Sequence, residues 1–151
     1  MKPDSLSSTS MFHGLDIIGS GLRAELARSE VVAANLANAN DTGTADDPPY
    51  ARRMVTFQEM LADASGGPVA MGVQLKEVFE DTDTPPRRIF DPGHPQADAS
   101  GWVLGSNVDM FKELVDLSVI ERSYQANISA MRSDRARISS SSTETSRISL
   151  P

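Results

Sequence analysis

The sequence predicts a mainly α fold, with long N- and C-terminal helices that pair as a coiled coil and a short antiparallel β and loop region between them. Apolar residues recur at seven-residue spacing near both ends, as in paired helices. The middle is broken by Gly, Pro and Asp clusters that separate short alternating runs. We place a flexible N-terminal extension at residues 1–11, a helix at 12–40, the loop and β insert at 41–106, a helix at 107–138 and a Ser/Thr-rich tail at 139–151.

The first helix is predicted from two rows of residues spaced seven apart. Glu25 and Ser29 interrupt these rows, which otherwise consist of apolar side chains. The second helix has a longer apolar row and a companion row that includes Glu121, and its start is marked by Asn107 and Asp109, residue types that cap helices or favour their N-terminus. The apolar members of the rows are Leu15, Ile18, Leu22, Val32 and Leu36 in the first helix, and Met110, Leu114, Leu117, Tyr124, Ile128 and Met131 in the second.

These rows are interpreted as surfaces for subunit assembly. Each helix would be about 40 to 47 Å long at about 1.5 Å per residue, whereas a compact domain of this length has a radius of gyration of only about 15 Å. The small insert is therefore too short to cover both helices. An antiparallel hairpin closed within one monomer is the alternative, but Glu25 and Glu121 suit an open, multi-partner surface better than a sealed seam. We accordingly expect the eleven apolar residues to form the subunit interface.

Four short strands are expected in the insert. Alternation predicts them at about residues 53–57, 73–79, 87–90 and 102–104, and turns are predicted at 41–50, 66–68 and 91–95. Three asparagines, Asn35, Asn38 and Asn40, cluster where the first helix should end. One Asn is enough to end a helix, so we expect the others to hold the outgoing loop or a neighbouring helix.

Composition excludes several classes of function. The net charge of −7 argues against nucleic acid as a partner, because neutralising phosphates requires a basic surface. There is no cysteine, which removes disulfides and thiolate chemistry. We expect neither a cleaved secretory signal nor a membrane-spanning segment, because the start has no apolar run and no stretch approaches about 18 apolar residues.

No catalytic, cofactor-binding or metal-binding residues are predicted. Asp91 and His94 are the nearest approach to a ligand pair, but a metal site needs further ligands and none is signalled. Their surroundings, Asp91, Pro92, Gly93, His94 and Pro95, are explained by a turn. A small metal-dependent enzyme using this pair remains an alternative, and so does a free-standing helical adaptor.

Residues 31–39, which include Asn35, Leu36 and Asn38, resemble the N-terminal signature of the bacterial flagellar basal-body rod protein family. Further segments resemble the proximal-rod member of that family. They are residues 49–50 and 55–57, 72–73, 90–98, 101–103, 107–109 with Asn107 and Asp109, 113–116, and 122–127 with Tyr124, Gln125 and Asn127. The resemblance covers about residues 12–132, and the ordered set is more specific than the Asn-Leu-Ala-Asn signature alone.

The resemblance implies a structural protein rather than an enzyme. It implies a subunit that polymerises through its terminal helices into the torque-transmitting rod of the basal body, which spans the periplasm. The implied partners are the protein itself, other rod proteins, the inner-membrane ring with the export-gate adaptor, and the flagellar type III export apparatus, with no small-molecule substrate. Another flagellar axial subunit is the alternative within the same class.

Overall fold

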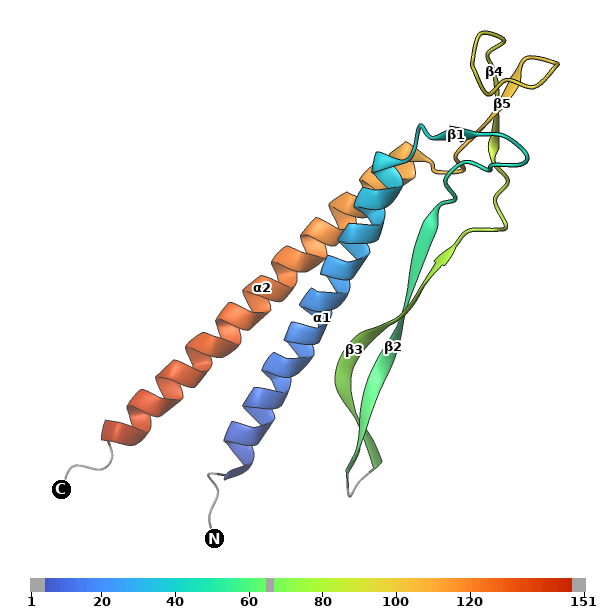
Figure 1. Ribbon diagram of the computed structural model, residues 1–151. Coiled ribbons are helices and arrows are strands. Elements are labelled where there is room, and N and C mark those ends of the chain that lie inside the picture. Colours follow the sequence, from blue (N-terminus) through green and yellow to red (C-terminus); the bar gives the residue numbers. More distant parts are fainter. Residues whose placement is uncertain (1–4, 65–66, 148–151) are drawn as a thin grey trace. The chain divides into compact units, whose positions relative to one another are not determined.

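The computed structural model describes residues 5–64 and 67–147, and its elements are drawn in Figure 1. Two long helices, α1 (Ser5–Ala37) and α2 (Met110–Arg147), enclose the strands in sequence. The strands are β1 (Thr42–Gly43), β2 (Arg53–Ala64), β3 (Gly67–Glu80), β4 (Arg87–Phe90) and β5 (Trp102–Gly105). Residues 1–4 of the expected N-terminal extension, 148–151 of the expected tail and residue 66 of the expected turn lie outside the described residues. No described helix is both long enough and apolar enough to cross a membrane.

The chain divides into two compact units. We call residues 1–26, 57–75 and 121–151 the first unit and residues 27–56 and 76–120 the second unit. The helices and the ribbon formed by β2 and β3 each contribute residues to both units. The well-buried apolar side chains of the described residues, Val32, Ala39, Val103, Val108 and Ile120, all belong to the second unit.

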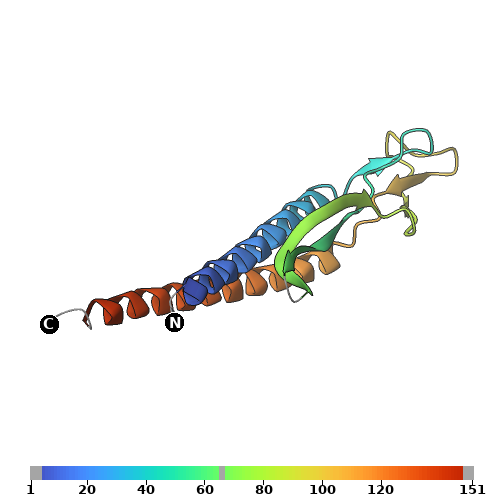
Figure 2. The ribbon, with the colours of Figure 1, turned by 90° about the horizontal axis from the view of Figure 1, so that it is seen from below.

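The strands form two antiparallel sheets, and this corrects the predicted fold class. β1, β5 and β4 make one sheet in that order, in which Phe90 pairs with Trp102 and Arg87 with Gly105. β2 and β3 run side by side as a two-stranded ribbon of 12 and 14 residues (Figure 1, Figure 2). About a quarter of the chain is strand, so a mainly α fold with a small β insert is wrong. The predicted strands at 53–57 and 73–79 stopped short of residues 58–64 of β2 and 67–72 of β3. Gln58, Glu59, Met60 and Leu61 do not alternate between polar and apolar, and Gly67 and Pro68 favour a turn, so the pattern gave no strand signal there.

The predicted coiled coil along the apolar rows is not what the structure shows. In the first unit, Gly14 lies against Asp134 and Gly21 against Asn127. In the second unit, Asn35 bonds to Glu113. These residues stand one position before members of the predicted rows, and they are polar or small. A glycine has no side chain and lets a neighbouring segment approach closely. Buried polar side chains can also join two helices when they hydrogen-bond to each other. The prediction considered apolar side chains alone.

Both helices extend further than the sequence pattern indicated. α1 starts at Ser5, inside the segment that we expected to be a flexible extension, and α2 continues to Arg147, inside the expected tail. The apolar rows give no signal in these stretches. Serine is only moderately unfavourable in a helix, so a helix can continue through it.

A close contact joins β3 to α1 within the first unit. The Ser20 hydroxyl is buried, donates to the Ile17 carbonyl at 2.7 Å and accepts from the Val73 N–H at 3.0 Å. Gly72 has a φ of +117°, and a Cβ at this position would overlap the Ser20 side chain. Only glycine meets both requirements, so this position fixes where β3 meets the helix.

Candidate functional site

The centre of the second unit is a polar cluster, which we call the polar junction. It consists of the buried side chains of Asn35 and Glu113, the partly buried side chains of Tyr50 and Arg52, and the backbone of Arg53. Glu113 is 0% exposed, one turn into α2. Its carboxylate accepts from Asn35 Nδ2 at 3.0 Å and from Arg52 Nε at 2.6 Å. A buried carboxylate is costly unless it is paired and hydrogen-bonded, and here it is both.

Asn35 uses its whole amide in the junction. Nδ2 donates to Glu113 and to the Arg53 carbonyl at 2.9 Å, while Oδ1 accepts from the Tyr50 hydroxyl at 3.0 Å and the Arg53 N–H at 2.8 Å. This one side chain therefore ties α1 to α2 and to the chain that enters β2. Burial raises the pKa of Tyr50, which keeps its hydroxyl protonated as the donor to Asn35.

Other residues cap the end of α1 and the start of α2. Asn38 Nδ2 donates to the Ala34 carbonyl at 2.8 Å, as expected for an Asn at a helix end. Asp109, rather than Asn107, caps α2, because its Oδ1 accepts from the N–H groups of Phe111 and Lys112 at 3.0 and 3.3 Å. α2 begins at Met110, so Asp109 occupies the N-cap position.

Asn107 instead holds three chain segments together. Its Oδ1 accepts from the Arg52 N–H at 2.6 Å, and its Nδ2 donates to the carbonyls of Asp81 and Thr84 at 3.0 and 2.8 Å. Arg87 does the same from β4, donating to the carbonyls of Ser106 and Ala39 at 2.7 and 2.6 Å. The connections around the polar junction are therefore fixed by side chains that bond to backbone groups.

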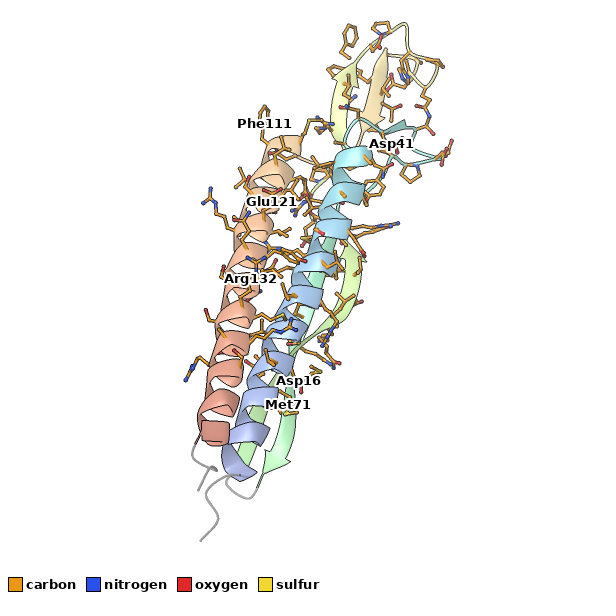
Figure 3. The ribbon with its side chains drawn as sticks, turned by 90° about the vertical axis from the view of Figure 1, so that its left-hand side faces the viewer. Asp16, Asp41, Met71, Phe111, Glu121 and Arg132 are labelled. Atoms are coloured by element: carbon orange, nitrogen blue, oxygen red, sulfur yellow. The ribbon has the colours of Figure 1, made fainter. Side chains whose placement is uncertain are left out.

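The opposite face of α2 is apolar and exposed. Phe111 is 83% exposed and projects from the start of α2, away from α1 (Figure 3), and Val115, one turn later, is 63% exposed. Neighbouring apolar side chains extend this surface, which we call the α2 stripe: Met110, Phe111, Leu114, Val115 and Val119. Exposed apolar groups gathered on one helix face are typical of an interaction surface.

The predicted interface residues are divided by the structure. Met110, Leu114 and Tyr124 are exposed, Val32 is buried, and the remaining members are half-buried: Leu15, Ile18, Leu22, Leu36, Leu117, Ile128 and Met131. On α2, Phe111, Val115 and Val119 are the exposed large apolar residues that the seven-residue rows missed. Their spacing of four residues places them on one face of a helix with 3.6 residues per turn, and this spacing could have revealed them.

The Asp91 and His94 pair forms a turn. The backbone N–H of His94 donates to the Asp91 carbonyl at 3.1 Å, and His94 Nδ1 accepts from the Gln96 N–H at 3.2 Å. The Asp91 side chain accepts from the Gly93 N–H at 3.2 Å, while Pro92 and Pro95 are exposed. Within residues 5–64 and 67–147, no three His, Cys, Asp or Glu side chains are placed to hold a metal ion.

Comparison with known proteins identifies the family. The family described as flagella basal body rod protein matches residues 15–43, and the flagellar basal body rod FlgEFG protein C-terminal family matches residues 99–143. The flagellar basal-body rod protein FlgC of Salmonella typhimurium is 41% identical over 116 residues, covering 77% of this chain and 84% of the relative. The chain belongs to the FlgC family of flagellar basal-body rod proteins.

Distant FlgC proteins support the same assignment. FlgC of Yersinia enterocolitica is 37% identical over 127 residues, covering 84% of this chain and 92% of the relative. FlgC of Bacillus subtilis is 36% identical over 140 residues, covering 84% and 93%. The family resemblance read from the sequence is thus confirmed, and the chain is a structural protein of the basal-body rod. The two matched segments contain Asn35 and Glu113, which meet in the polar junction.

Proposed function

We propose that this FlgC protein polymerises within the rod through its helices, with the α2 stripe as a principal contact between subunits, and that the resulting array transmits torque. The observation that carries the proposal is the exposure of the α2 stripe, above all of Phe111 and Val115. Burying one such side chain contributes roughly 1.5–3 kcal/mol. Several contacts of this size, repeated by every subunit, would make an array stiff.

The remaining interface residues of the sequence prediction belong to this proposal as well. Tyr124 is exposed, and Leu117, Ile128 and Met131 are half-buried further along α2, so each has surface left for a neighbour. On α1 the corresponding residues are Leu15, Ile18, Leu22 and Leu36. Val32 is buried within the second unit and contributes to its core instead.

The polar junction supports the proposal from the inner side of the same helix. Glu113 lies on the turn that carries the α2 stripe, and it is held by Asn35 and Arg52. A second ion pair joins Arg28 to Asp116 at 3.7 Å, on the next turn. A stripe that transmits force needs a fixed support, and these bonds hold α2 to the rest of the second unit.

The partners and the route of the chain are also part of the proposal. The other rod proteins, the inner-membrane ring and the export-gate adaptor would contact the assembled subunit. The chain would reach the rod through the flagellar type III export apparatus without a cleaved signal peptide. The support for these statements is membership of the FlgC family.

The experiment replaces the gene copy with variants and measures the chain in isolated basal bodies by mass spectrometry, together with motility. Val115→Asp places a charge in the α2 stripe and should remove the chain from the rod. Ser118→Asp and Ser129→Asp are a matched pair, since both serines are exposed on α2 and each bonds to the carbonyl four residues earlier, at 3.1 and 2.9 Å. Ser118 lies within the stripe and Ser129 beyond it.

We expect Ser118→Asp to reduce incorporation at least tenfold and Ser129→Asp to leave it within twofold. Circular dichroism of each purified variant checks that the helices remain. Normal rods containing Val115→Asp would contradict the proposed interface. Basal bodies that lack the wild-type chain altogether would contradict the assignment to the rod.

A further inference from the structure

The second unit exposes another apolar surface at the end of its three-stranded sheet. Phe90 of β4 and Trp102 of β5 are cross-strand partners, 61% and 36% exposed, with ring centroids 5.1 Å apart and an interplanar angle of 62°. The guanidinium of Arg88 lies over the Trp102 ring, 4.8 Å from its centroid. We call Arg88, Phe90, Asp91 and Trp102 the β4–β5 tip. Tryptophan and arginine are the residue types that dominate binding energy at protein interfaces.

The β4–β5 tip and the α2 stripe are two different surfaces on one unit. A symmetric dimer uses the same surface on both copies, so it would satisfy only one of them. A head-to-tail contact uses both, because the first surface of one copy meets the second surface of the next. Such a contact does not close on itself in general, and it produces rows or helices of subunits.

The charges at the two surfaces are complementary. The tip carries a cation, Arg88, and an exposed anion, Asp91. The start of the stripe carries Lys112, whose side chain is 76% exposed, and Asp109, 3.8 Å away. A tip placed on a stripe can pair Asp91 with Lys112 and Arg88 with Asp109 of the next copy.

We propose that the β4–β5 tip of one FlgC subunit docks on the α2 stripe of the next copy, head to tail. This inference rests on the proposed function, because it names the occupant of the stripe through which the subunits polymerise. Phe90 and Trp102 supply the apolar contact with Phe111 and Val115 of the neighbouring copy. The charged groups around them set the register.

The size of the surfaces indicates a contact that is weak by itself. A stable interface buries about 800 Å² on each partner, and one fully buried aromatic side chain supplies only about 150–250 Å². The tip offers two partly exposed aromatic rings. Two isolated copies would therefore separate readily, whereas a subunit inside a row is held on both sides and gains the avidity of two contacts.

The test uses site-directed cross-linking in assembled basal bodies, and the chain is suited to it because it contains no cysteine. Ser100→Cys places a thiol beside the tip, between Asp98 and Trp102, and Ser118→Cys places one within the stripe; both serines are exposed. The two variants are co-expressed as full chains with different epitope tags. Basal bodies are isolated and treated with a short bismaleimide.

We expect a product of twice the chain mass that carries both tags. Ser129→Cys replaces Ser118→Cys as the matched control, and its yield should be at least tenfold lower. Rods that contain both variants but give no mixed product above the control would overturn the head-to-tail contact and leave the proposed rod function intact. A product that joins either thiol to a different protein, or joins like thiols only, would overturn it as well. Absence of the chain from the rods would instead count against the proposed function.

A charge exchange tests the register independently. Asp91→Lys in the copy with the tip thiol should reduce the mixed product several-fold, because it faces Lys112 of the neighbour. Lys112→Asp in the copy with the stripe thiol should restore the product. An unchanged yield in the single variant, or no recovery in the pair, would show that these two side chains do not meet.

Discussion

The two faces of α2 at its N-terminal end differ in how their side chains are satisfied. On the inner face, Glu113 is fully buried and accepts hydrogen bonds from two partners within the chain. On the outer face, Phe111 and Val115 lie largely in solvent. The inner face stabilises the subunit, and the outer face is left for assembly. One short stretch of helix can serve both purposes because residues three or four apart share a face, so its two faces carry different side chains.

Loss of the Glu113 carboxylate should have the largest effect on the inner face. Glu113→Ala removes the acceptor of Arg52 Nε and one of the two acceptors of Asn35 Nδ2. Breaking a buried ion pair costs up to about 3–5 kcal/mol, and the Arg52 pair with Asp116 at 3.5 Å offsets part of this loss. Urea unfolding of the purified chain, followed by circular dichroism, measures the change. Lys112→Ala, on an exposed neighbouring residue, should lie within about 0.5 kcal/mol of wild type. Equal stability of the two variants would contradict the importance of the polar junction.

Removal of the α2 cap should have an intermediate effect. Asp109→Ala leaves the N–H groups of Phe111 and Lys112 without their acceptor, and loss of an N-cap costs about 1 kcal/mol. The same urea titration provides the readout. Asp109→Ser keeps an oxygen at the cap and should recover most of the loss. If Asn107→Ala lowered the free energy of unfolding and Asp109→Ala did not, the assignment of Asp109 as the cap would be wrong.

Acid should cause a smaller loss through Asp81. Hydrogen bonds from the Thr84 hydroxyl and N–H lower the pKa of the Asp81 carboxyl below its usual value of about 3.9. A lowered pKa in the folded state means that this group stabilises the fold above pH about 4. The contribution is lost as the pH falls through the folded pKa. Carboxyl titration by NMR measures the shift, and Thr84→Ala should move the pKa of Asp81 upward, toward the unperturbed value.

Substitution on the outer face should have the smallest effect on stability. Phe111→Ser removes an aromatic ring that is 83% exposed, so the free energy of unfolding should change by less than about 0.5 kcal/mol. The same variant should nevertheless enter rods poorly. Urea unfolding of the purified variant and its incorporation into rods together distinguish a role in subunit stability from a role in assembly. A large loss of stability would mean that Phe111 supports the subunit itself.

Much of the element order follows from local pattern. β4 occupies Arg87–Phe90 and β5 begins at Trp102, where alternating residues between turn signals predicted short strands. Asn38 ends α1 as an Asn near a helix terminus should. These features depend on neighbours in sequence, which is why periodicity and turn chemistry reveal them.

The polar junction was only partly accessible from the same signals. The cluster of asparagines predicted that one of them holds the outgoing loop or a neighbouring helix, as Asn35 does, but its charged partners were not indicated. Arg52 and Glu113 are 61 residues apart, and neither stands out among the charged residues of the chain. The seven-residue rows were also misplaced, because Gly14, Gly21 and Asn35 meet the opposite helix through size and hydrogen bonding. A hydrophobic pattern does not register such contacts. The ribbon was underestimated because residues 58–61 do not alternate and Gly67 and Pro68 favour a turn, although all of them lie in strands.

The contact between Gly72 and Ser20 restricts how this chain can vary. Two constraints exclude a side chain at position 72: the positive φ and the overlap with Ser20. Removing the overlap leaves the unfavourable φ unchanged. Replacing Ser20 by glycine would open room for a methyl group at position 72 but would leave the backbone strain. Saturation mutagenesis with selection for swimming should therefore recover glycine alone at position 72, whatever residue occupies position 20. Val73, which contributes its N–H, should accept many side chains.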